Sequence, residues 1–338
     1  MYTAADWPIA AKMAFPAAEA VADASGEAGK LTGHRRCTCS SPVSVWRQQL
    51  KSVADMGYRY IDPIDDWLHL PELSDDLFAE FKKLLDEFGL SVWAVSFGRR
   101  SPMDRQRWRE NIAAYKRTID RAEALQLRVV NIGFMQDLTP EQQRAQWFWH
   151  VDGYRDDPAL RDVALERVAD VAQYAQRRGV EISLELYEDT FLGSGKMAAK
   201  FVQDLGAKNV GINPDVGNLI RLHREIEPWE ESFEYVLPYA NYWHIKNYVR
   251  DFDPATGAYY SFPAALEDGY INYRWVIYRA LELGYQGAFM TEHYGGDWLG
   301  IGARNARYIR SVVRSYESLV AAQSADGMAA KCAAGIGK

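Results

Sequence analysis

Four stretches in the second half of the chain place a carboxylate or a histidine near the end of a short apolar run. Glu185 lies in EISLELYE, Asp215 in VGINPDVGN, His244 in YWHIKNY and Glu292 in AFMTEHY. One such residue alone is usually a cap or a solvated loop residue, but four in succession point to a shared site. Three carboxylates and one imidazole form an oxygen-rich donor set for a divalent ion. Mn²⁺ is favoured, Mg²⁺, Co²⁺ or Zn²⁺ are compatible, and open coordination positions would accept a substrate oxygen.

The elements that must position these residues alternate between short strands and amphipathic helices. Strands are predicted at 58–64, 90–97, 127–133, 180–188, 209–217, 241–248 and 287–294, and an eighth in WPIAAKMAF (7–15). Helices are predicted between them, at 41–57, 73–89, 104–126, 157–179, 194–206, near 227–240, near 270–285 and at 301–323. This α/β pattern predicts a parallel sheet closed into a (β/α)₈ TIM barrel. Because the carboxyl ends of barrel strands face one mouth, the four residues are expected to meet there.

The domain organisation is expected to be simple. Residues 1–324 are predicted to form one barrel domain with extended βα loops, and the small-residue-rich segment 325–338 a flexible tail. The chain has no GxGxxG after its first strand and no GxxxxGK[ST], so nucleotide-binding folds lose support.

Composition narrows the class of partner. The net charge is −7 and the pI is about 5.5, which argues against nucleic acid or an anionic membrane as a partner. No apolar run approaches the ~18 residues that a membrane span needs, and the first residues do not read as a signal peptide. The three cysteines, Cys37, Cys39 and Cys332, are few and odd in number, which suits a reducing compartment. A cytoplasmic protein is therefore expected.

The motifs LELYED, INPDVGN, YWHIKNY and MTEHYGGD together resemble the xylose-isomerase-like barrel superfamily, over roughly residues 41–320. The resemblance implies that Glu185, Asp215, His244 and Glu292 are metal ligands. In the epimerases of that group the two glutamates also move the substrate proton, so Glu185 and Glu292 are candidate catalytic residues here. One departure is Asn218, since epimerase-like members often have a histidine at that position. An AP endonuclease is disfavoured, because it would hold several zinc ions with more than the six histidines present.

Within the superfamily, the chain length, the WPIAA start, the WFWH loop and the EHYGGD strand end are similar to the large subunit of bacterial C-glycoside deglycosidases. That resemblance implies a small β-sandwich partner subunit, and a 3-oxo C-glucoside of a polyphenol as substrate. The C–C bond would be cleaved by elimination, with His150 as a second proton carrier. The alternatives are a ketose 3-epimerase, a sugar isomerase or a related keto-sugar-acid decarboxylase. A non-catalytic sugar-binding subunit is a further reading, and an oligomer is expected.

Other residues are candidates for substrate contact, each with a structural alternative. Trp147 and Trp149 could form an aromatic wall over the mouth or pack locally, just as the 13% of aromatic residues could serve the core or stack on sugars. Lys246 shares a strand face with His244 and could bind a substrate oxygen or form a salt bridge. The remaining candidates are Asn218, Asp62 and His293, which could equally close a turn, cap an element or support the metal ligands.

Overall fold

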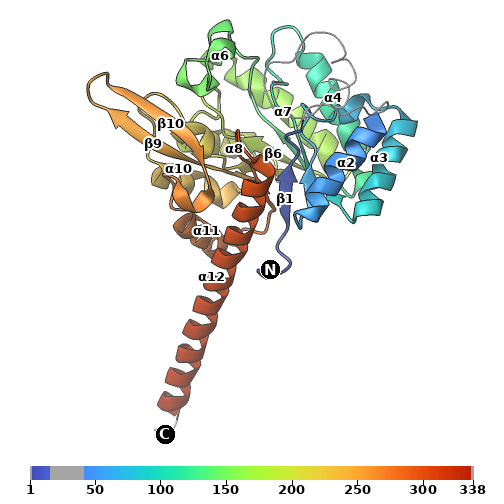
Figure 1. Ribbon diagram of the computed structural model, residues 1–338. Helices are drawn as coiled ribbons and strands as arrows, with labels where there is room; N and C mark the ends of the chain where they lie inside the picture. Colours follow the sequence, from blue (N-terminus) through green and yellow to red (C-terminus); the bar gives the residue numbers. More distant parts are fainter. Residues whose placement is uncertain (1, 16–41, 336–338) are drawn as a thin grey trace.

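The computed structural model describes residues 2–15 and 42–335, and the side chains of residues 2–15 and 42–323. Eight positions of parallel strand form the barrel in these ranges, surrounded by helices (Figure 1). The strands are β1 Ile9–Lys12, β2 Tyr60–Asp62, β3 Ser91–Val92 with β4 Ala94–Ser96, β5 Val129–Ile132, β6 Glu181–Glu185, β7 Val210–Asn213, β8 Trp243–Ile245 and β11 Phe289–Thr291. The predicted TIM barrel is confirmed.

The strand order explains how the barrel closes. One run of hydrogen-bonded strands is β3-β2-β1-β11-β8 and the other is β4-β5-β6-β7, all of them parallel. The predicted strand 90–97 is interrupted at Trp93, so that its two halves pair in different runs and join them. At the opposite seam, a parallel bridge between Ile212 and Ala240 links β7 to the segment before β8.

Eight longer helices follow the strands, as the alternating pattern predicts. They are α2 Pro42–Asp55, α3 Asp75–Phe88, α4 Trp108–Asp120, α7 Arg161–Gln176, α8 Gly195–Leu205, α10 Trp229–Val236, α11 Tyr273–Glu282 and α12 Trp298–Gly335. Local signals set their ends: Ser74 caps α3 by accepting a hydrogen bond from the Leu77 amide. At the other end of α3, Gly89 adopts the left-handed conformation with φ 62° that a glycine tolerates best.

Several boundaries differ from the sequence-based expectation. The predicted helix 104–126 is divided into α4 and the short α5 Ala122–Leu125, and two further short helices are α6 Pro140–Arg144 and α9 Gly217–Ile220. The predicted strand 241–248 ends as β8 at Ile245, and the chain continues into an unpredicted antiparallel hairpin of β9 Asn247–Asp253 and β10 Ala258–Ala264. The hairpin stands apart from the barrel strands in Figure 1.

The C-terminal helix α12 reaches Gly335 and projects away from the barrel (Figure 1). Its backbone therefore includes most of the segment expected to be a tail, whose flexibility remains a prediction. Residues 336–338, Cys37 and Cys39 lie outside the described residues.

Many aromatic side chains serve the core. Five tryptophans, Trp7, Trp46, Trp67, Trp149 and Trp243, are less than 2% exposed. Helices that cover the strands on one side bury these rings between the two layers, which is what the core interpretation of the aromatic content predicts. In the part of the chain that the structure describes, none of the helices is long and apolar enough to cross a bilayer.

Candidate metal centre

The four predicted metal ligands meet at the carboxyl-terminal mouth of the barrel. Glu185 ends β6, Asp215 follows β7 by two residues, His244 lies in β8 and Glu292 directly follows β11. Glu185, Asp215 and His244 each offer a ligand atom, and these atoms lie within 4.8 Å of one another. Glu292 Oε2 lies 3.7 Å from His244 Nδ1. The side chains predicted from strand ends are therefore close in space and buried.

A buried network orients the imidazole of His244. Its Nε2 lies 3.0 Å from Ser96 Oγ, and Ser96 donates its hydroxyl and amide hydrogens to Asp62 at 2.5 and 2.9 Å. Tyr242 donates a further hydrogen bond to Asp62 at 2.7 Å. With Nε2 engaged in this way, Nδ1 faces Glu185 Oε2 at 3.3 Å. Asp62, predicted to contact substrate, therefore positions the histidine, a task that carboxylates perform around ligating histidines.

The electrostatics of His244 favour a cation beside Nδ1. Burial by itself would lower the pKa of His244, but the charge of Glu185, the hydrogen bonds of Asp62 and Glu185 and the charge of Glu292 raise it to about 10. Either a proton or a metal ion beside Nδ1 would answer the negative charge of these carboxylates.

Two asparagines hold the carboxylate of Glu185. Asn218 Nδ2 donates to Glu185 Oε1 and to Asp215 Oδ2, both at 3.1 Å, and Asn131 Nδ2 donates to Glu185 Oε2 at 2.9 Å. Asn218, predicted to contact a sugar, is 1% exposed and joins two of the predicted metal ligands. Asn131 was not predicted; its signal is a lone amide inside the apolar strand VVNI.

Two lysines reach the same carboxylates. Lys246 Nζ donates to Asp215 Oδ2 at 2.6 Å and to Glu292 Oε2 at 2.8 Å, and Lys12 Nζ donates to Glu292 Oε1. The salt-bridge alternative for Lys246 is therefore the one observed. Lys12 was missed, although it is a lone charge at the end of the apolar strand IAAK. Burial opposes ionisation of Glu292, but Lys12 and Lys246 hold its pKa well below the usual range.

The donor set fits a divalent ion. Asp215 is 0% exposed, and its Oδ1 has no hydrogen-bond partner among the described residues. Burial and the charges of Glu292 and Glu185 raise the pKa of Asp215, although Lys246 opposes this rise. A buried oxygen without a donor is costly, and coordination to a cation would relieve that cost. Asp215 Oδ1, a Glu185 oxygen and His244 Nδ1 are donors of the kind that Mn²⁺ or Mg²⁺ accepts.

The WFWH loop packs against the hairpin. Trp147 and Trp149 stack with ring centroids 4.8 Å apart, and Trp149 Nε1 donates to Ser261 Oγ at 2.9 Å. His150 Nε2 lies 3.1 Å from the carbonyl oxygen of Ser261, and burial lowers the pKa of His150. The structure thus joins His150 to β10, and no contact between it and the predicted metal ligands is found among the described residues. His293, also half-buried, faces the backbone of Ala264, and burial lowers its pKa.

A buried ion pair lies beneath this loop. Arg221 is 0% exposed and its Nη2 donates to both oxygens of Glu188, at 3.1 and 3.0 Å. Its guanidinium carbon is 4.8 Å from the ring centroid of Phe148 and 5.2 Å from those of Trp149 and Tyr187. Burial opposes its charge, but Glu188 keeps the pKa of Arg221 well above the usual value. Neither residue was predicted from the sequence.

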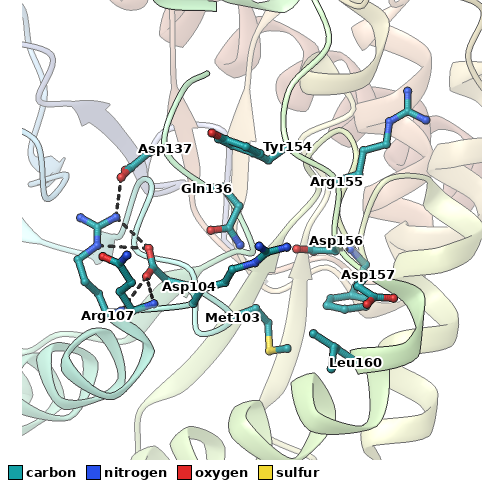
Figure 2. A pocket seen from close by; sticks show the side chains of 13 residues that line it. Met103, Asp104, Arg107, Gln136, Asp137, Tyr154, Arg155, Asp156, Asp157 and Leu160 are labelled. Carbon is teal, nitrogen blue, oxygen red and sulfur yellow. Dashed lines mark hydrogen bonds and ion pairs between the residues drawn. The ribbon is translucent and has the colours of Figure 1, made fainter. Parts of the chain in front are cut away.

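The same end of the barrel carries a cavity of about 400 Å³ (Figure 2). The segments that follow β4, β5 and β6 line it, with Met103, Tyr154 and Asp156 among its residues. Across Figure 2, Arg107 binds Asp104 and Asp137 at one side of the cavity, and Asp156 and Asp157 lie at the other. A volume of this size is in the range of small-ligand pockets.

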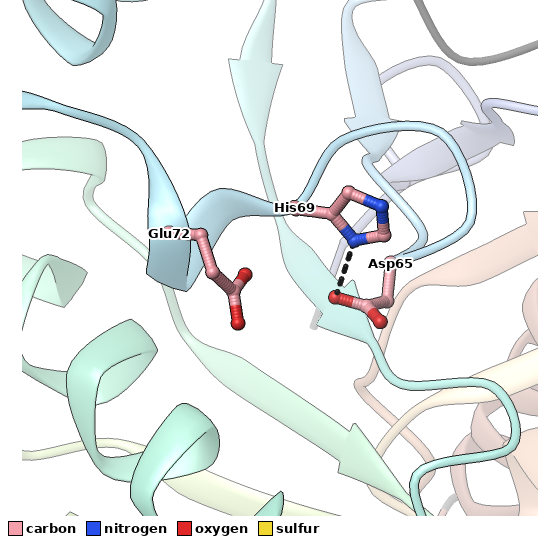
Figure 3. Close-up of side chains that lie close together, drawn as sticks. All are labelled: Asp65, His69 and Glu72. Atoms are coloured by element: carbon pink, nitrogen blue, oxygen red, sulfur yellow. Dashed lines mark ion pairs between the residues drawn. The ribbon is translucent and has the colours of Figure 1, made fainter. Parts of the chain in front are cut away.

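A second group of metal-competent side chains consists of Asp65, His69 and Glu72 (Figure 3). His69 and Glu72 are exposed, and Arg100 binds Asp65 Oδ2 at 2.5 Å and Glu72 Oε1 at 3.0 Å. Since one arginine already neutralises much of the charge of both acids, the buried cluster at the mouth is the better candidate for a metal.

Comparisons with known proteins agree with this architecture. Residues 50–316 match the family model described as xylose isomerase-like TIM barrel. Among solved structures, a xylose isomerase-like TIM barrel protein from Mycobacterium smegmatis in complex with magnesium is 46% identical, with a TM-score of 0.84 over 94% of this chain and 99% of that chain.

Two more distant structures share the fold. A D-allulose 3-epimerase from Methylomonas sp. is 13% identical, with a TM-score of 0.58 over 93% of this chain and 96% of its own. A 3-keto-D-glucoside 4-epimerase from E. coli is 12% identical, with a TM-score of 0.56 over 90% of this chain and 100% of its own. None of the curated proteins matches the sequence.

Proposed function

This chain belongs to the xylose isomerase-like TIM barrel family, and from that premise we propose that it is a divalent-metal-dependent enzyme acting on a keto sugar. The reaction would begin with removal of a proton from the carbon beside the sugar carbonyl. The observation that carries the proposal is the buried cluster of Glu185, Asp215 and His244 with Glu292 beside it. The magnesium bound by the 46% identical relative supports a divalent ion, and Mg²⁺ and Mn²⁺ are the ions to test.

The residues of the cluster have separable tasks in this proposal. Asp215, His244, Glu185 and Glu292 would hold the ion, which when bound would polarise the substrate carbonyl. Burial raises the pKa of Glu185, but His244 and Lys246 outweigh it and lower that pKa to about 2. Glu185 is therefore ionised at neutral pH and can accept a proton on Oε2. The ammonium groups of Lys12 and Lys246 would favour negative charge that develops on the substrate oxygen.

The fate of the proton separates two candidate reactions. Return of the proton to the same or the neighbouring carbon gives a sugar isomerase or ketose 3-epimerase, and the epimerases that share the fold support this outcome better. Expulsion of an aryl carbon gives the C-glycoside deglycosidase, with a small β-sandwich partner subunit. The stacked Trp147 and Trp149 favour this second candidate, because flat apolar rings suit an aryl group.

Solvent-deuterium exchange tests the shared first step. The protein with Mn²⁺ or Mg²⁺ is incubated in D₂O with a panel of ketoses and with a 3-oxo C-glucoside, and products are followed by NMR. We expect deuterium at the carbon beside the carbonyl, no exchange after EDTA treatment, and none for Glu185→Gln. Glu166→Gln, an exposed position on α7, is the matched control and should exchange normally. Absence of exchange on every substrate would refute the proposal.

The same incubation distinguishes the two outcomes. Release of the free aglycone from the 3-oxo C-glucoside supports the deglycosidase, and epimerised ketose without aglycone release excludes it. His150→Ala addresses the proposed second proton carrier, because it should spare metal binding and slow only aglycone release. If turnover is also unchanged, His150 serves the contact with Ser261 and not the chemistry.

A further inference from the structure

The ammonium group of Lys246 occupies a place inside the proposed metal centre. It is 2% exposed and lies 2.6 Å from Asp215 Oδ2 and 2.8 Å from Glu292 Oε2, so one cation bridges two of the four predicted ligands. Lys12 contacts Glu292 only, from the first strand. Three carboxylates, those of Glu185, Asp215 and Glu292, thus face two ammonium groups before any metal ion enters.

The fold holds Lys246 in this place from both ends. Tyr273 donates a hydrogen bond at 2.7 Å to the backbone oxygen of Lys246. Gly217 leaves room for the side chain, because a Cβ atom there would lie 2.6 Å from Lys246 Cγ and 3.0 Å from Asp215 Oδ1. The space beside Asp215 is therefore shaped for the lysine stem, and the free Asp215 Oδ1 remains next to it.

We propose that Lys246 is a resident cation of the metal centre, which a divalent ion must displace from Asp215 and Glu292 in order to bind. The inference rests on the proposed metal centre and deepens it. The positive charge of Lys246 satisfies the two acids when the ion is absent, and the same charge repels an incoming ion at short range. Displacement frees the ammonium group toward the substrate oxygen, the role predicted for Lys246 from the sequence.

The proposal predicts that loss of the lysine charge strengthens metal binding. Lys246→Met should bind Mn²⁺ at least about tenfold more tightly than the natural protein, because repulsion between like charges a few ångströms apart is large in a buried site. Lys246→Gln, which removes the charge and keeps hydrogen-bond donors, should show the same direction. Lys12→Met should have a smaller effect, since Lys12 contacts only one ligand. Lys200→Met, at an exposed position on α8, is the control and should bind as before.

Titration calorimetry of the full-length protein with Mn²⁺ measures these affinities, and thermal unfolding gives a second readout. Without metal, Lys246→Met should unfold at a lower temperature, because Asp215 and Glu292 lose their counter-charge. Added Mn²⁺ should raise its Tm by more than it raises that of the natural protein. If Lys246→Met does not fold without metal, expression with Mn²⁺ should restore folding, and failure to restore it would overturn the proposal.

The outcomes separate this inference from the proposed function. If the natural protein binds Mn²⁺ and neither Lys246 variant binds it more tightly, the resident-cation proposal is wrong and the metal centre stands. If neither the natural protein nor the variants bind Mn²⁺ or Mg²⁺, both are wrong.

Discussion

Replacement of Glu188 by glutamine tests whether the buried ion pair with Arg221 supports the aromatic loop over the mouth. The change keeps the size of the side chain and removes its charge. Arg221 is 0% exposed, and its Nε and Nη1 have no hydrogen-bond partner among the described residues, so Glu188 supplies the nearest opposite charge. After the substitution, a guanidinium surrounded by aromatic rings would be left without a counter-charge.

The expected cost follows from this burial. Removing one partner of a buried pair typically costs about 3–5 kcal/mol, because the remaining charge is neither solvated nor paired. With roughly 2 °C of Tm per kcal/mol for a domain of this size, Glu188→Gln should lower Tm by roughly 6–10 °C. Asp152→Asn is the control, because Asp152 is 61% exposed and its pair with Arg224 should contribute less than about 1 kcal/mol.

Thermal unfolding followed by circular dichroism measures both variants, and tryptophan fluorescence reports on Trp149, whose ring centroid is 5.2 Å from the guanidinium. The double variant Glu188→Leu with Arg221→Met should recover much of the loss, since both charges are then replaced by apolar groups. If Glu188→Gln costs no more than Asp152→Asn, the pair does not contribute as its burial implies.

Three further predictions concern other parts of the fold. Asn218→Leu should weaken Mn²⁺ binding about 10–100-fold in calorimetric titration, since Asn218 holds two of the predicted ligands; unchanged affinity would contradict this role. Gly287→Ala should lower stability in urea unfolding by about 1–3 kcal/mol, because its Cβ would lie 2.2 Å from the Asn241 carbonyl oxygen. Burial raises the pKa of Asp156 to about 6, above its unfolded value of 3.8, so the folded protein holds more protons and loses stability as pH rises from about 4 to 6. Asp156→Asn should accordingly be about 1–2 kcal/mol more stable than the natural protein at pH 7.5 and lose that advantage below pH 4; an advantage independent of pH would refute the assignment.

The barrel and the four predicted ligands could be read from the sequence because their signals are local. A parallel strand buried on both faces is a short apolar run, and a polar residue at its end stands out. Glu185, Asp215 and Glu292 were recognised in this way, each at or just after the end of its strand. The shared orientation of barrel strands then implied a common site.

The partners of these ligands depend on contacts between residues far apart in the chain. Lys12 meets Glu292 across 280 positions, and Ser96 meets His244 across 148. No local pattern shows which strands become neighbours around a closed barrel, or that Lys246 points at Asp215 and not at the mouth. The hairpin that engages His150 was missed because its exposed residues alternate weakly. The sequence by itself therefore determined the barrel and the donor residues, whereas the tertiary structure alone decided their charge balance, since that depends on which side chains share one buried space.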